Sequence, residues 1–130
     1  MTAFRPLRLL RNLSYLAVVD DVQAALCERF GVEFHASQPH LKLGLALAAL
    51  GQQPINGLRH PPKGDTTGWY VWGGLELSPA ADFFQPVHLD HLEEVLPAVI
   101  PYLGLPAGWR FQIAPGHEDV WFDAALLSES

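Results

Sequence analysis

The sequence predicts an α+β fold in which a small antiparallel sheet, including a C-terminal hairpin, packs against three or four helices. Three observations support this prediction. Segments with helical spacing of apolar residues are interleaved with short aromatic, β-branched segments. A Pro-Gly pair separates the last two strand-like segments. A chain of 130 residues with 49% hydrophobic content suits one domain, residues 1–130, around one core.

The first two helices are expected at residues 20–31 and 40–51. In the first, apolar residues recur on one face, an aspartate at position 20 or 21 caps the start and Gly31 ends the helix. The second segment, HLKLGLALAALG, has alternating leucines that also fit a strand. Its alanines and closing glycine favour a helix.

Residues 86–105 have apolar residues at helical spacing but contain two prolines. Pro97 and Pro101 cannot donate backbone hydrogen bonds within a helix. We therefore expect one helix to about Leu96 and a second, short helix that ends near Leu103.

Strands are expected in four places. A short one lies around residues 55–59, and the aromatic segment WYVWGGLEL covers 69–77, with its Gly-Gly pair marking a bulge or turn. Residues 108–114 alternate apolar and polar side chains, and residues 119–123 pair back onto them. Pro115-Gly116 forms the tip of this hairpin.

Charge is distributed unevenly along the chain, whose net formal charge is −6. Residues 1–75 contain seven Lys/Arg and five Asp/Glu, whereas residues 76–130 contain one Arg and nine Asp/Glu. An acidic half argues against nucleic acid as a ligand and suits a basic protein partner. A single cysteine, Cys27, fits a reducing cytoplasm, and the most apolar segment, 41–50, is too short to span a membrane.

The segment PGHEDVWFD combines acidic and aromatic side chains. On a strand, Asp119, Trp121 and Asp123 share one face, and the two apolar residues between them share the other. His117 and Glu118 lie at the turn. The pattern fits an acidic surface that meets a basic partner, and also a cation site, although the spacing of a zinc or calcium motif is absent.

A metal-binding enzyme, such as a small hydrolase, is an alternative. His88 and His91 lie three residues apart on the predicted helix and can serve as ligands. This alternative requires them to converge with His117, Glu118 and Asp119 in one pocket. The glutamate spacing of known helical metal sites is missing, so partly buried or surface histidines are the favoured interpretation.

Tryptophans and a basic loop offer a further set of contacts. All four tryptophans fall in expected strands, and a thin domain cannot bury them all. A small-ligand-binding module would use Trp69, Trp72 and Trp121 as stacking platforms. The loop over residues 57–69 groups Arg59, His60, Lys63 and Asp65, which form either internal ion pairs with the acidic hairpin or a recognition loop.

An ordered series of segments resembles a known family. PINGLRHPP, DTTGWYVWGG, DFFQPVHLDHL, PYLGLPAGWRF and EDVWFD resemble, in that order, bacterial immunity-protein domains classed as immunity family thirty-three-like, from polymorphic toxin and contact-dependent systems. The resemblance covers about residues 45–127 and leaves the first 40 uncovered. One departure is GGLELS, in which Leu75 separates the glycines from Glu76, where the family has an acidic residue directly after glycine.

The resemblance implies a cytoplasmic α+β protein that binds and neutralises a cognate toxin, and it brings no catalytic residues. We also expect no cofactor and no metal. We therefore expect a protein toxin as partner, and neither nucleic acid nor membrane. The expected contact residues are Tyr70, Trp72, Glu76, Glu118, Asp119, Trp121 and Asp123, with Arg59, His60, His88 and His91 as secondary candidates.

Overall fold

A six-stranded mixed sheet forms the centre of the molecule. The computed structural model describes the backbone of residues 4–128 and the side chains of residues 17–128. The strands are β1 (Lys42–Leu45), β2 (Ile55–Arg59), β3 (Thr66–Gly73), β4 (Gln85–His88), β5 (Trp109–Ala114) and β6 (His117–Phe122). They are ordered β4-β1-β3-β2-β5-β6. The β1–β3 pair is parallel and the other pairs are antiparallel.

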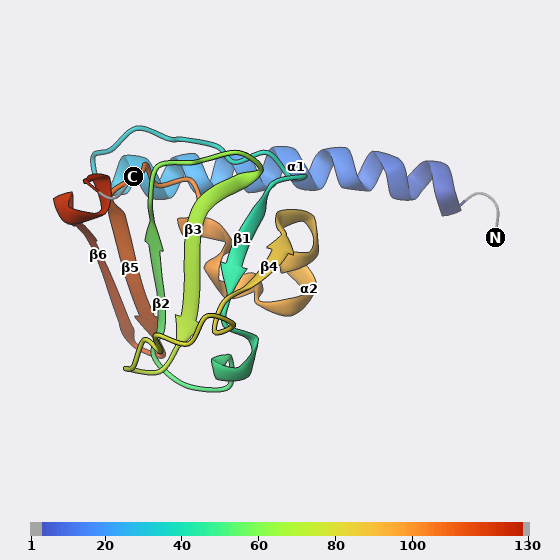
Figure 1. Ribbon diagram of the computed structural model, residues 1–130. Coiled ribbons are helices and arrows are strands. Elements are labelled where there is room, and N and C mark those ends of the chain that lie inside the picture. Colours follow the sequence, from blue (N-terminus) through green and yellow to red (C-terminus); the bar gives the residue numbers. More distant parts are fainter. Residues whose placement is uncertain (1–3, 129–130) are drawn as a thin grey trace.

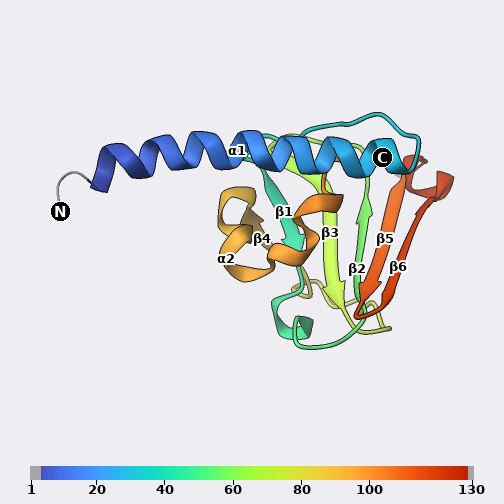
Figure 2. The same ribbon diagram turned by 180° about the vertical axis from the view of Figure 1, so that it is seen from behind.

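The helical elements lie on both sides of this sheet, and only the longest of them, α1, crosses a whole face (Figures 1 and 2). They are α1 (Phe4–Arg29), the single turn α2 (Leu92–Val95) and four 3-10 segments, η1 (Leu47–Ala49), η2 (Leu89–His91), η3 (Pro97–Tyr102) and η4 (Ala124–Leu127). In Figure 2, α1 crosses the strands with the α2–η3 region beside it. No helix in the described part of the chain is long and apolar enough to cross a membrane.

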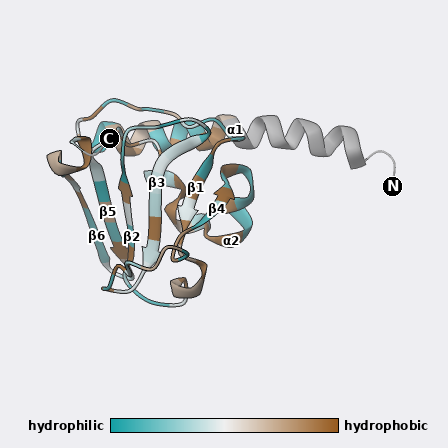
Figure 3. Ribbon diagram, in the orientation of Figure 1, coloured by the Kyte–Doolittle hydropathy of each residue, from teal (hydrophilic) through white to brown (hydrophobic). Residues whose placement is uncertain are grey.

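The main core lies between the sheet and this helical layer. Trp69, Val71 and Phe111 of the sheet are at most 1% exposed, and they pack with Leu26 of α1 and Val99 of η3 in one cluster. Hydrophobic residues are interspersed with hydrophilic ones along the strands (Figure 3), as expected for a sheet with two different faces.

The predicted architecture is wrong in its balance of elements. The sheet is mixed and six-stranded, and one long helix and one helical turn replace the three or four helices. Residues 40–51 form β1 and η1 instead of a helix. Leu43 and Leu45 are buried at 1% and 0% exposure, so the alternating leucines reflect the period of a strand.

The second correction concerns residues 86–96. They begin with β4, which pairs with β1, and only Leu92–Val95 is α-helical. Pro86 lies on an edge strand, where its missing N–H costs nothing. The expected break at Pro97 is confirmed, since η3 begins there as a separate 3-10 segment.

Other sequence predictions are confirmed with adjusted boundaries. β2 and the hairpin of β5 and β6 lie where expected, with Pro115-Gly116 between the two hairpin strands. His117 and Glu118, expected at the turn, instead pair with Ala114 and Ile113 as the first residues of β6. The helix at 20–31 is the last part of α1, so neither aspartate caps its start. It ends at Arg29, and Gly31 has a φ of 72°, the left-handed conformation of a helix stop.

Candidate functional site

The face of the sheet away from α1 is formed by alternate residues of four neighbouring strands. In β3, Trp69 and Val71 point into the main core, and Tyr70 and Trp72 therefore point to the other side. In Figure 1 this side is turned to the viewer and no helix crosses it. The same alternation places Trp121 of β6 on this side of the sheet.

Strand register arranges these side chains in two rows. The first row runs through Tyr70, Leu58, Arg110 and Trp121, which are successive cross-strand partners. The second row runs in the same way through Trp72, Asn56, Gln112 and Asp119. We call these eight residues the open face. Leu58, Trp72 and Asn56 are buried within it, and the first two form a small second core with Ala49 of η1 and Leu126 of η4. The sequence prediction that Asp119 and Trp121 share a face fits this register.

A small aromatic cluster lies at one end of the open face. Phe84 makes edge-to-face contacts with Tyr70, at a centroid distance of 5.1 Å, and with Trp72, at 6.1 Å. Phe83 packs on Phe84 at 4.9 Å. Trp72 is only 5% exposed, and its Nε1 has no hydrogen-bond acceptor among the described residues. The loop before β4 therefore provides an apolar rim, and neither Phe83 nor Phe84 was among the predicted contact residues.

A cation lies at the other end of the open face. The guanidinium of Arg110 lies 5.5 Å from the ring of Trp121, and its Nη1 donates to Asp123 Oδ2 at 3.0 Å. That hydrogen bond lowers the pKa of Asp123. Arg110 therefore largely neutralises the negative charge of Asp123. The negative charge of Asp119 is not neutralised by this pair.

Polar side chains connect the middle of the second row. His117 Nε2 donates to Gln112 Oε1 at 3.0 Å, and Gln112 Nε2 donates to Asn56 Oδ1 at 3.0 Å. Asp119 is exposed and forms no ion pair within the described part of the chain. Asp119 thus offers a free carboxylate beside Trp121.

Glu118 points to the opposite side of the sheet from Asp119 and Trp121. Its two carboxylate oxygens accept from Arg29 at 2.9 and 2.8 Å, and Tyr102 also donates to it. The hydrogen bond from Arg29, followed by that from Tyr102, lowers its pKa. Burial raises the pKa of Tyr102, so its hydroxyl remains the donor. Glu118 therefore ties the hairpin to α1.

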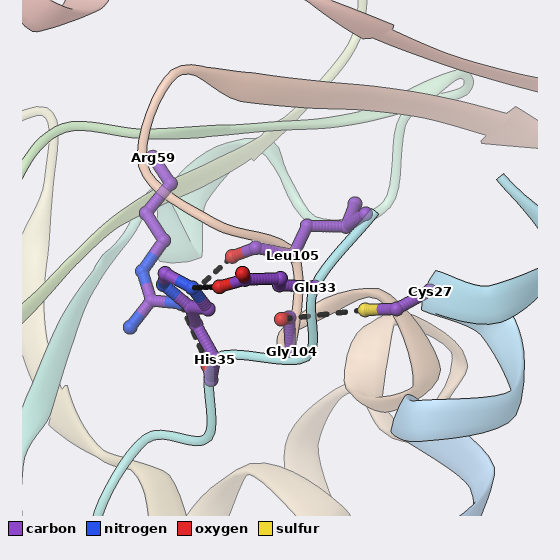
Figure 4. A network of polar contacts seen from close by, with 6 residues as sticks. All are labelled: Cys27, Glu33, His35, Arg59, Gly104 and Leu105. Atoms are coloured by element: carbon purple, nitrogen blue, oxygen red, sulfur yellow. Dashed lines mark hydrogen bonds and ion pairs between the residues drawn. The ribbon is translucent and has the colours of Figure 1, made fainter. Parts of the chain in front are cut away.

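Arg59 is a buried residue of β2, at 3% exposure. Its guanidinium donates to the carbonyl oxygens of Thr67, His35 and Leu105 at 2.9, 3.0 and 2.7 Å, and two of these residues are drawn in Figure 4. Burial lowers its pKa to about 10. Arg59 holds segments 35–37 and 103–105 against the sheet, and it has little surface to offer a partner.

The remaining basic-loop residues lie nearer the surface. His60 packs edge-to-face on Tyr70 at 5.7 Å, and its Nδ1 donates to the carbonyl oxygen of Leu126 at 3.2 Å. Lys42 pairs with Asp65 at 3.0 Å, which lowers the pKa of Asp65. The predicted ion pairs between this loop and the hairpin are thus absent from the described contacts, whereas His60 borders the open face.

The histidines of the metal alternative are far from the hairpin. His88 and His91 lie at the β4 edge, 6.1 Å apart between ring centroids, and His117, Glu118 and Asp119 belong to β6 at the opposite edge. Among the described residues, no group of three or more His, Cys, Asp or Glu side chains could hold a metal ion. The structure does not bring this set together.

The three tryptophans of the small-ligand alternative also fail to share a platform. Trp69 is 1% exposed in the main core, and its Nε1 donates to the carbonyl oxygen of Leu103 at 3.0 Å. Trp72 and Trp121 lie on the other side of the sheet, at either end of the open face. Cys27 is buried at 1% exposure as a core residue, and burial raises its pKa.

Two further features complete the surface. Glu76 follows β3 in an exposed loop, beside Leu75 and Leu77, which are 83% and 52% exposed. On the helical side, a groove of about 280 Å³ lies between α1, residues 36–39 and residues 89–93. None of the predicted contact residues lines it.

These features define a class of protein: a small domain built on one mixed sheet, with a helix-covered face and an open face of aromatic and charged side chains. Residues 22–123 match the family model of the Imm33-like domain. The chain belongs to this immunity-protein family, as its sequence resemblance implied. The match begins at Val22, so the last part of α1 is included, although the resemblance covered only residues 45–127. Neither a curated protein nor a solved structure matches the chain significantly.

Proposed function

We propose that this protein neutralises a cognate toxin in the bacterial cytoplasm by stoichiometric binding, without catalysis. The observation that carries this proposal is the open face. A sheet normally buries its apolar side chains against a second layer. Here the half-buried Tyr70 and Trp121 occupy the side that no α-helix covers, together with the free carboxylate of Asp119, and Trp72 lies on the same side at 5% exposure.

The composition of the open face suits a protein partner. Aromatic residues and arginine are enriched at the centres of protein interfaces, and charged groups at the rim set association rate and partner choice. Tyr70, Trp121 and Arg110 are half-buried, so they are held in place and still present surface. Asp119, Glu76 and the charge of −6 favour a basic toxin surface.

The first test is co-expression with the product of the adjacent gene. The proposal predicts that this product is toxic alone, that the protein described here removes the toxicity, and that the two form a complex of fixed stoichiometry in isothermal titration calorimetry. Unchanged toxicity in the presence of the folded protein would count decisively against toxin neutralisation.

Variants test the assignment of the open face. Trp121→Ala should weaken binding by at least about 30-fold, because truncating an aromatic side chain that a partner buries costs about 2 kcal/mol or more at an interface hot spot. Asp119→Lys should slow association and reverse its salt dependence. Matched controls are Val95→Ala and Glu94→Lys on α2, which are exposed on the helical layer. If the control variants weaken toxin binding as much as the open-face variants do, the interface does not lie on the open face.

A further inference from the structure

The outer edge of β6 carries backbone hydrogen-bonding groups that no other strand uses. β6 is the last strand in the sheet order, and Figures 1 and 2 show no strand beyond it, with the short η4 at its C-terminal end. Asp123 N donates to Gly108 O at 2.7 Å, and a two-residue loop joins Ala114 to His117. Antiparallel pairs alternate between bonded and non-bonded positions. The N–H and C=O groups of Glu118, Val120 and Phe122 therefore point away from β5.

This edge has only part of the usual protection against pairing, because its charged residues, Glu118 and Asp119, are its sole blunting feature. Edge strands are commonly blunted by proline, lysine, a bulge or a short length. β6 has six residues in uninterrupted register with β5, and its sequence, HEDVWF, contains none of those features. At the opposite edge, β4 has four residues, contains Pro86 and leads directly into η2. Of the two edges, β6 is therefore the one that is better suited to pair with an additional strand.

Charge indicates what kind of strand can pair there. Glu118 and Asp119 place carboxylates on both faces of the edge, and Asp123 follows at its end. Glu118 is partly neutralised by Arg29, whereas Asp119 has no cation among the described residues. A second copy of this chain, which also has a net charge of −6, would be repelled from this acidic edge. A cationic strand of another protein is the complementary occupant.

We propose that the toxin adds an extended, basic segment to β6 as a seventh strand of the sheet; this inference rests on the toxin-binding function proposed above. The main-chain groups of Glu118, Val120 and Phe122 supply the hydrogen bonds, and side chains supply specificity. Alternate residues of the added strand lie beside Trp121 and Asp119 on one face, which calls for lysine or arginine. The others lie beside Val120 and Phe122, which is 47% exposed, and are apolar.

Residue-resolved amide hydrogen exchange by NMR tests this mode of binding, using the full chain free and in complex with a catalytically inactive form of the adjacent-gene toxin. In the free protein, the amides of Glu118, Val120 and Phe122 should exchange fast, and those of Asp119 and Trp121 slowly. In the complex, the three fast amides should slow by about 100-fold or more, which gives an alternating pattern of new protection.

The outcomes separate this inference from the function. A complex in which these three amides still exchange fast overturns strand addition and leaves neutralisation through the open face intact. Failure of any complex to form removes the proposed function and this inference with it. Concentration-dependent protection of the same amides in the free protein would show self-pairing and would also overturn the inference.

A variant pair gives an independent measurement. Val120→Pro removes an outward N–H without removing a bond to β5, and Val120→Ala trims the same side chain while retaining the N–H. Toxin affinity should fall at least tenfold more in the proline variant than in the alanine variant, with both melting curves recorded. Equal affinities of the two folded variants contradict strand addition. If the proline variant does not fold, the exchange pattern of the unmodified protein decides.

Discussion

A single methyl group added at Gly57 is expected to destabilise the domain. Gly57 lies in the middle of β2 on the helix-covered face, directly opposite Phe111 of β5. A Cβ at this position would lie 2.9 Å from Phe111 Cδ2 and closer still to Cε2 and Cζ. Because these are ring atoms of a fully buried side chain, the clash cannot be relieved by a flexible side-chain end.

The size of the effect follows from two opposing terms. Glycine to alanine at a compatible position stabilises a protein by about 0.4–1 kcal/mol through the unfolded chain. Overpacking a core costs about 1–3 kcal/mol, and here the ring of Phe111 is held between Tyr102, stacked at 4.9 Å, and Trp69 at 5.6 Å. The overlap term should win, because the added Cβ would overlap the ring closely, so the free energy of unfolding should fall by roughly 2 kcal/mol for Gly57→Ala once the first term is subtracted.

Urea denaturation measures this loss, with Gly51→Ala as a control. Gly51 has open space around its missing Cβ and lacks a positive φ, so its alanine variant should be neutral or slightly stabilised. Adding Phe111→Leu to Gly57→Ala should give a coupling energy of about 1 kcal/mol or more, since the smaller side chain makes room. Additive losses, or a Gly57→Ala variant as stable as the unmodified protein, would refute the packing argument.

The alternation of apolar and polar residues along a strand was the most informative pattern in the sequence for predicting this fold. Residues 108–114 and 119–123 alternate clearly, so both strands and the shared face of Asp119 and Trp121 followed from spacing alone. The same rule, applied to LKLGLALAAL, would have found β1. We predicted a helix there because alanine favours helices. In the structure Gly44 lies so close to Tyr70 that a Cβ would come within 2.7 Å of the ring, which shows how tightly this segment packs against β3. The packing of β1 in the sheet thus overrides the helix propensity of the alanines that follow it.

Contacts between distant segments were beyond prediction from spacing. Glu118 was expected to meet a partner, but its carboxylate binds Arg29, which lies 89 residues away in the sequence. Arg59 was placed both at the end of a short strand and in the basic loop that follows it, and only the register of β2 shows that its side chain lies inside the domain. The cross-strand neighbours of Arg110, which are Leu58 and Trp121, were not predicted either. Strand pairing determines such neighbours, and a single sequence does not specify the pairing.

Two further predictions concern hydrogen bonds that the sheet makes or lacks. Arg29 holds the pKa of Glu118 below its ordinary value of 4.5, so this carboxylate stabilises the fold above that pH and loses its contribution as the pH falls through the folded-state pKa. Glu118→Gln should therefore flatten the acid side of the stability curve measured by denaturation, and an unchanged curve would show that the ion pair contributes nothing. The buried tryptophans of β3 form a matched pair, because Nε1 of Trp69 donates to a carbonyl oxygen at 3.0 Å and Nε1 of Trp72 has no acceptor among the described residues. Trp69→Phe leaves that buried carbonyl without its donor, which costs about 1–3 kcal/mol, whereas Trp72→Phe removes a donor that was already unpaired. Trp69→Phe should thus lose more free energy of unfolding than Trp72→Phe by roughly that amount, and equal losses would mean that the N–H of Trp72 is bonded in solution.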